Sequence, residues 1–223
     1  VGTNAIRQGG AANGSRNTAV GSAALSNGSG AYNNVAIGYS SLAAGVSGSS
    51  NTAVGTFALQ NNTSANYNVG IGYETLRSAT TGGNNTAIGH AAMYSNTTGD
   101  VNTAVGENAL VSNTSGRYNT SVGVQSQEQN TTGQSNTAIG VAAIDRNIAG
   151  HNNAVLGAFA GRYISDNSTF NTAIDNSVLI GASAKPLANN ANNEIVIGYN
   201  AIGNGSNTVT LGNASITSVK TSG

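Results

Sequence analysis

The residues that could perform acid–base or metal chemistry are few, and they do not recur at a common spacing. The two histidines, His90 and His151, lie far apart and at different places in the internal repeat of the chain. The acidic residues are also scattered, so no pair is predicted to sit within the ~5 to 10 Å that glycoside hydrolysis requires. The adjacent pair Asp145 and Arg146 is interpreted as a solvated corner. Cysteine is absent. We therefore expect no catalytic residue, no metal site and no cofactor, and predict that the protein is not an enzyme.

Three tyrosines could instead contact a ligand. Tyr39, Tyr73 and Tyr199 each follow the last glycine of a recurring motif of the type NTAVG. This position varies in chemistry from one repeat to the next, which is typical of a residue that faces solvent. Exposed tyrosine rings can stack on sugars, so these three are candidate glycan contacts. The alternative is a structural or incidental use.

A second candidate site is the segment in which the repeat loses its register. It contains Arg162, Tyr163, Asp166 and Phe170. Residues inserted into a solenoid form loops on one face, and such loops can carry binding. The sequence predicts a coil with an extra excursion here, and a receptor contact is one interpretation. The other is that the insertion only joins two arrays of different period.

The elements that position these residues follow from an internal repeat. We call the glycine that closes each copy of the motif the marker glycine. Nine marker glycines are spaced 17 residues apart, namely Gly21, Gly38, Gly55, Gly72, Gly89, Gly106, Gly123, Gly140 and Gly157. Gly2 precedes the series, and Gly181, Gly198 and Gly212 extend it at steps of 24, 17 and 14 residues. The spacing predicts thirteen coils.

Each position within the repeat has a characteristic residue type. Val, Ile or Leu stands directly before the marker glycine, and Leu, Met or Ile stands four residues after it in most coils. We expect both positions to form apolar ladders. Ala, Ser or Thr lies three after the glycine and mostly Ala lies two before it, so we expect a face of small residues that buries against identical copies. Asn four before the glycine and Gly ten after it are expected to form corners in the left-handed backbone conformation.

These features predict an all-β fold, a parallel β-roll or β-solenoid with 17-residue coils. The Asn positions should stack into a hydrogen-bonded ladder along the rod. We divide the chain into an array of regular coils at 1–160, an irregular coil with an inserted loop at 161–181, and shorter-period coils at 182–223 that lead to a neck or a further fibre domain. A single coil buries too little apolar surface to offset its ordering entropy, which favours a homo-oligomer.

Composition excludes several classes of partner. Only 7% of the residues are charged and the formal net charge is zero, so neither nucleic acid nor an anionic membrane surface is an expected partner. No apolar run approaches the ~20 residues of a membrane helix, so no membrane insertion is expected in this segment. The start, VGTNAIRQGG, has neither an initiator Met nor a signal peptide, and is expected to belong to a processed form or an excerpt of a longer chain.

Several motifs resemble those of a known family. NSVLIG at 176–181, NEIVIG at 193–198 and NTVTLG at 207–212 resemble the head repeats of YadA-like trimeric autotransporter adhesins. The 17-residue NTAVG form resembles a longer variant of that repeat, found in bacterial surface proteins and bacteriophage tail fibres. The resemblance implies a left-handed roll, a homotrimer, and an extracellular role on a bacterial cell surface or virion tail. It also implies attachment to a host-surface receptor or glycan.

Two other functions remain open at this stage. An ice-binding solenoid would use the threonines three before the marker glycine, but Val35 and Val69 interrupt that row. These threonines share the strand parity of the Val/Ile position, so we expect them to pack against protein. A self-polymerising structural filament is the other alternative, because the ends of a solenoid can stack on one another.

Overall fold

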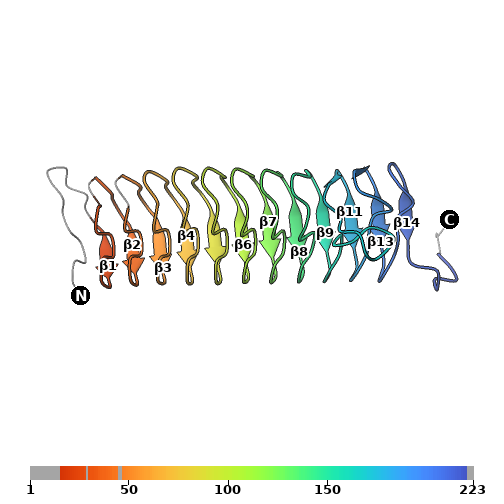
Figure 1. Cartoon of the computed structure of the whole chain (residues 1–223), viewed down its shortest axis with the longest axis horizontal. Coiled ribbons are helices and arrows are strands. Elements are labelled where there is room, and N and C mark those ends of the chain that lie inside the picture. The colour runs from red at the N-terminus through yellow and green to blue at the C-terminus, as the bar shows by residue number, and fades with distance from the viewer. Residues whose placement is uncertain (1–15, 29, 45–46, 220–223) are drawn as a thin grey trace.

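The computed structural model describes residues 16–28, 30–44 and 47–219. Over these residues the chain is an all-β rod of short strands without a helix (Figure 1). Its strands are β1 (Thr18–Val20), β2 (Val35–Ile37), β3 (Thr52–Val54), β4 (Val69–Ile71), β5 (Thr86–Ile88), β6 (Thr103–Val105), β7 (Thr120–Val122), β8 (Thr137–Ile139), β9 (Ala154–Leu156), β10 (Ile174–Asp175), β11 (Val178–Ile180), β12 (Ala191–Asn192), β13 (Ile195–Ile197) and β14 (Val209–Leu211).

Twelve strands form a single parallel sheet along the rod. Its order is β1-β2-β3-β4-β5-β6-β7-β8-β9-β11-β13-β14, and β10 pairs with β12 in a separate sheet. The register places each motif over the next, so that Val54 pairs with Ile71 and Ile71 with Ile88. This pairing confirms the parallel β-solenoid and its 17-residue coils. The coil predicted at Gly2 lies outside the described residues.

Each strand of the large sheet turns its middle residue into the roll and its two outer residues away from it. The middle residue Ala53 is fully buried, as is Leu59, which stands four after the marker glycine. Ile71 and Ile88, directly before their marker glycines, are 39% and 38% exposed. Of the two predicted apolar ladders, only the one four after the glycine is core. We call it the leucine ladder; it comprises Leu25, Leu42, Leu59, Leu76, Met93, Leu110 and Ile144.

The expectation that the small residues face other copies of the chain is wrong. From the coil of Gly21 to that of Gly198, the Ala, Ser or Thr residues two before and three after the marker glycine are buried inside the roll, whereas Thr210 and Ser215 of the last coil are not. The interior is narrow, so the strand's middle residue meets the leucine ladder directly: a Cβ added to Gly70 would lie 3.4 Å from Cδ1 of Leu59. Where the strand's middle residue is large, the ladder position that faces it is small. Leu179 faces Gly161, and a Cβ added to Gly161 would lie 2.9 Å from Cδ1 of Leu179. Close packing thus pairs one large residue with one small one.

The corners also differ from the prediction. Left-handed residues are found five before, two after and four after the marker glycine, and they include Tyr67 (φ 60°) and Leu59 (φ 51°). Neither the Asn four residues before the marker glycine nor the Gly ten residues after it has a left-handed backbone. Glycine is needed ten residues after the marker glycine for another reason. A Cβ on Gly99 would lie 2.4 Å from the carbonyl oxygen of Gly116 in the next coil, so the coils could not approach this closely.

The asparagines form the predicted ladder. The backbone N–H of Asn102 donates to Oδ1 of Asn85 at 2.9 Å, and Nδ2 of Asn102 donates to the carbonyl of Gly116 at 2.8 Å. A second ladder runs beside it, in which Nδ2 of Asn113 donates to Oδ1 of Asn96 at 2.7 Å. These amides are buried, so their bonds to neighbouring coils satisfy polar groups that water cannot reach.

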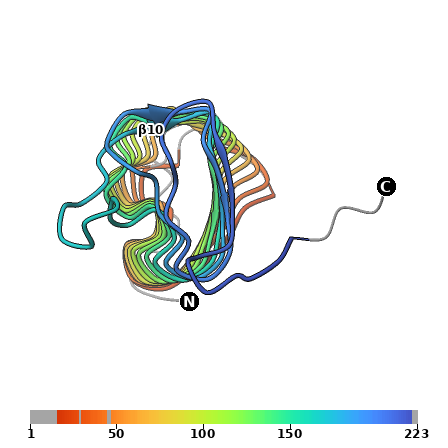
Figure 2. The same ribbon diagram turned by 90° about the vertical axis from the view of Figure 1, so that its right-hand side faces the viewer.

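The irregular coil contains the predicted excursion. β9 pairs directly with β11, so the segment between Gly157 and Gly181 is one long coil of the roll. We call residues 162–171 the excursion. An antiparallel bridge between Tyr163 and Phe170 closes it, and it projects from one side of the roll (Figure 2). The motif-like NTAID does not join the large sheet, because its last two residues form β10.

Candidate functional site

The most extensive surface feature is the outward side of the large sheet. We call it the outer face: the residues directly before and three before the marker glycines, on the twelve strands. The first row is Val20, Ile37, Val54, Ile71, Ile88, Val105, Val122, Ile139, Leu156, Ile180, Ile197 and Leu211; the second is Thr18, Val35, Thr52, Val69, Thr86, Thr103, Thr120, Thr137, Ala154, Val178, Ile195 and Val209. All are half-buried or exposed, and none is charged. The shared parity of the Thr and Val/Ile rows is confirmed, but within one chain these rows remain open.

An aromatic row lies along four coils beyond the marker glycines. It comprises Tyr39, Phe57, Tyr73 and His90, with successive ring centroids 5.4, 6.2 and 5.6 Å apart. The guanidinium of Arg77 lies 4.7 Å from the Phe57 ring centre. Tyr39 and Tyr73 are 52% and 46% exposed, which confirms their predicted exposure. Their use as glycan contacts stays a prediction.

Tyr199 is separate from this row. It follows the marker glycine Gly198, seven marker glycines beyond the one that precedes Tyr73, and is 72% exposed. Among the described aromatic pairs it has no partner. The three tyrosines predicted as one set therefore form two sites, and Tyr199 would contact a ligand by itself.

The excursion brings three of its four candidate residues together. The Tyr163 and Phe170 rings stack at 4.9 Å between centroids. The Arg162 guanidinium lies 5.5 Å from the Tyr163 ring centre and 5.8 Å from that of Phe170. Asp166 is not part of this cluster. Its carboxylate accepts hydrogen bonds from Ser168 and from the backbone and hydroxyl of Thr169.

Those hydrogen bonds explain the electrostatics of Asp166. They stabilise the ionised form, first through the Thr169 hydroxyl, and lower the pKa of Asp166 to about 2. A carboxylate with these hydrogen bonds stabilises the turn of the excursion. This structural role explains Asp166 without a ligand.

A buried carboxylate anchors the base of the excursion. Asp145 is 1% exposed, and its Oδ2 lies 3.3 Å from Nε of Arg162 and 3.8 Å from Nε of Arg146. Burial raises the pKa of Asp145 to about 6, although both arginines oppose the shift. Asp145 and Arg162 each stand five residues after their marker glycine, in adjacent coils, so the carboxylate of one coil stacks on the guanidinium of the next.

The sequence reasoning missed several of these residues. Phe57 and His90 complete the aromatic row. Phe57 was missed because it stands two residues after its marker glycine, whereas Tyr73 stands only one after its own. The interpretation of Asp145 as a solvated corner is wrong, because this residue is buried. The available signal was its 17-residue spacing from Arg162.

Among the described residues, no group of three or more His, Cys, Asp or Glu side chains could hold a metal ion. The described part of the chain also contains no helix of the length and apolarity needed to cross a membrane. Comparisons of the chain with protein-family models, curated proteins and solved structures gave no match.

Proposed function

We propose that this chain is a non-enzymatic structural and adhesive segment of a homotrimeric fibre. In this proposal it forms the head of a trimeric surface adhesin or part of a bacteriophage tail fibre, outside the cell, and mediates attachment to a host cell or surface. Two things support the proposal: the straight stack of coils, which suits a rod that provides reach, and the resemblance of its motifs to YadA-like head repeats.

The observation that carries the proposal is the outer face. Along the whole sheet its side chains are apolar or carry a hydroxyl group, and none is charged. On ordinary protein surfaces, by contrast, exposed apolar residues are scattered singly. Ile37, Ile88 and Ile139 are each about 40% exposed. Covering one such side chain contributes roughly 1 kcal/mol, so a row of this length contributes on the order of 10 kcal/mol per chain.

A closed trimer would cover this face on every copy. Three chains arranged about an axis parallel to the rod would each turn the outer face inward, and closed symmetry leaves no copy with an open face. The aromatic row and the excursion would then be available for a receptor or glycan. Attachment would occur along the side of the fibre as well as at its tip.

Sedimentation equilibrium of the full chain tests the assembly. We expect a mass three times that of the 22.0 kDa chain, constant across protein concentration. A mass that grows with concentration would favour a self-polymerising filament, and a monomer at all concentrations would refute the fibre proposal. Binding of the labelled trimer to bacterial and animal cells, with and without glycosidase treatment, tests attachment.

One observation favours a second candidate, an ice-binding surface. Thr86, Thr103, Thr120 and Thr137 stand in an unbroken row on consecutive strands, and all face outward. The sequence predicts that they pack against protein, but no part of the described chain covers them. Thermal hysteresis of a dilute solution distinguishes the two functions, since a trimer that buries this row should show none.

A further inference from the structure

Lys185 occupies a position that the repeat reserves for an apolar residue. It stands four after the marker glycine Gly181, the place taken by Leu59 and Leu110 in the leucine ladder. Its backbone is held as in other coils, because its N–H donates to the carbonyl of Ala201 at 3.0 Å. Only 3% of the residue is exposed. A lysine at this position replaces an apolar core side chain, and lysine is rarely buried without a charged partner, so its presence calls for an explanation.

The ammonium of Lys185 has amide partners but no counter-charge. It donates to Oδ1 of Asn200 at 2.8 Å and to Oδ1 of Asn167 in the excursion. None of the ion pairs among the described residues includes it. Burial lowers the pKa of Lys185, because no carboxylate offsets the lost solvation. An ammonium has three donors, so one remains for a further acceptor.

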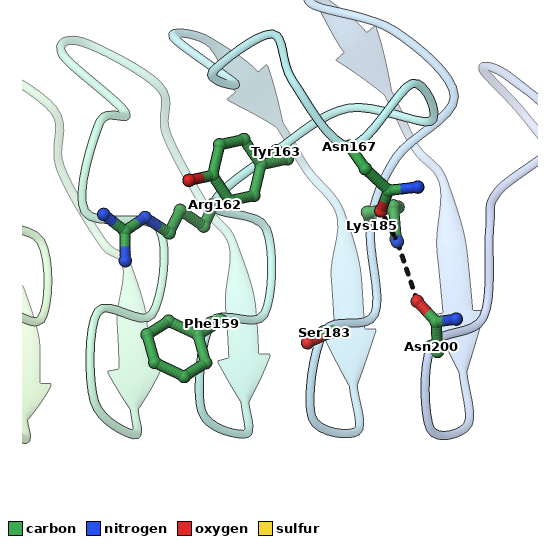
Figure 3. A pocket seen from close by; sticks show the side chains of 7 residues that line it. All are labelled: Phe159, Arg162, Tyr163, Asn167, Ser183, Lys185 and Asn200. Atoms are coloured by element: carbon green, nitrogen blue, oxygen red, sulfur yellow. Dashed lines mark hydrogen bonds between the residues drawn. The ribbon is translucent and has the colours of Figure 1, made fainter.

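Lys185 lines a pocket beneath the excursion. The pocket has a volume of about 320 Å³ and is lined by Phe159, Arg162, Tyr163, Asn167, Ser183, Lys185 and Asn200 (Figure 3). Phe159, Ser183 and Asn200 come from the turns of three successive coils, each two residues after its marker glycine, and they form the floor. The excursion supplies the opposite wall through Tyr163 and Asn167.

The lining combines two types of group. Phe159 and Tyr163 offer apolar ring surface, and Phe159 is 43% exposed. Ser183 and Asn200 offer hydroxyl and amide groups. No carboxylate lines the pocket. Of the two cations, Arg162 already faces the carboxylate of Asp145 at 3.3 Å, so Lys185 is the cation without an anionic partner.

We propose that this pocket binds the carboxylate of an acidic sugar, with the Lys185 ammonium as its anchoring group. A sugar ring packs on aromatic side chains and exchanges hydrogen bonds with hydroxyls and amides, while a carboxylate supplies the missing counter-charge. The volume lies at the lower end of the range for small-molecule sites, which suits one or two sugar units. The inference rests on the proposed attachment function for its setting and names a hexuronate-type glycan as the ligand class.

Isothermal titration of the full chain with glucuronate, and in parallel with glucose, sulfate and phosphate, tests the proposal. We expect glucuronate to bind and the neutral sugar to bind roughly tenfold more weakly or not at all, because it lacks the charge-assisted hydrogen bond. Equal binding of glucose would overturn the role of Lys185. Binding of sulfate or phosphate as tight as that of glucuronate would mean a general anion site and would overturn the sugar assignment.

Two variants separate the site from the fold. Lys185→Leu restores the residue of the leucine ladder, so we expect a higher melting temperature together with loss of glucuronate binding. Ser183→Phe fills the pocket and keeps the charge; Ser183 (φ 56°) shares the left-handed backbone of Phe159 (φ 59°), so the turn accepts the ring. Arg117→Met, at a side chain 51% exposed outside the pocket, is the control and should bind normally. Glucuronate binding that survives both pocket variants would refute the proposal.

The outcome is independent of the trimer. The pocket lies within one chain, so a monomer that binds glucuronate would refute only the fibre proposal. A trimer with no affinity for glucuronate would refute only the pocket.

Discussion

Two residues of one coil provide a matched test of the outer face. Ile139 lies on the outer face in β8, and Val141 follows the next marker glycine in the turn. Both are β-branched, and they are 40% and 43% exposed. We expect Ile139→Lys to abolish the trimer and Val141→Lys to leave it intact. In a single chain both introduced side chains stay in contact with water, so each should cost about 1 kcal/mol or less of stability.

The two variants differ only when the outer face is covered. In Ile139→Lys, the three introduced ammonium groups would then lose their solvation near the trimer axis, without a carboxylate on that face to pair with them. Removing an unpaired ammonium from water costs several kcal/mol, so three copies destabilise the trimer by on the order of 10 kcal/mol. Since ~1.4 kcal/mol is a factor of ten, the association constant should fall by several powers of ten.

Sedimentation equilibrium at matched concentrations measures the mass, and circular dichroism verifies that each chain is folded. The expected result is a folded monomer for Ile139→Lys beside a trimer for Val141→Lys. The reasoning is refuted if both variants sediment with the mass of the wild type. It is equally refuted if Val141→Lys dissociates and Ile139→Lys does not, because the interface would then lie at the turns.

Three further predictions concern the roll itself. Leu59→Ala should lower the free energy of unfolding by about 3 to 5 kcal/mol in urea titrations, because the leucine is fully buried; an effect below about 1 kcal/mol would argue against a core ladder. Gly72→Ala should cost about 3 kcal/mol or more by the same measurement, since its φ is 137° and the added Cβ would lie 2.5 Å from the carbonyl oxygen of Gly89. Burial raises the pKa of Asp145 from 3.8 to about 6, so the folded state holds this proton more tightly than the unfolded chain, and stability should fall as pH rises between about 4 and 6. Asp145→Asn should flatten that part of the pH profile, and an unchanged profile would contradict the assignment.

The repeat spacing was sufficient to predict the sheet and its register. Equal steps between marker glycines place Val54, Ile71 and Ile88 on adjacent strands, whatever the details of the turns. The inside and the outside of the strand were harder to assign. Ala and Val alternate, and both are apolar, so a reversal of the two faces fits the sequence equally well. Only the position of the opposing leucine ladder decides that the small residue is inside.

The candidate site was predictable in part. The position of Tyr39 after a marker glycine indicated its exposure. Its contact with Phe57 could not be predicted, because Phe57 stands two residues after its marker glycine and reaches Tyr39 only through the left-handed turn. The 17-residue spacing of Asp145 and Arg162 indicated that the two stack in adjacent coils. The burial of Asp145 also depends on the path of the excursion, which the spacing does not predict. Lys185 did leave a signal in the sequence, a charge at a ladder position.

The direct stacking of one strand on the next also bears on how such a chain changes in evolution. Each unit contacts only its two neighbours, so a genetic duplication or deletion of one whole unit leaves the cross-section intact. Every such event would lengthen or shorten the rod by about 4.8 Å, the spacing of paired strands. A population could therefore vary the distance between the ends of this protein in small uniform increments, without requiring a new interface.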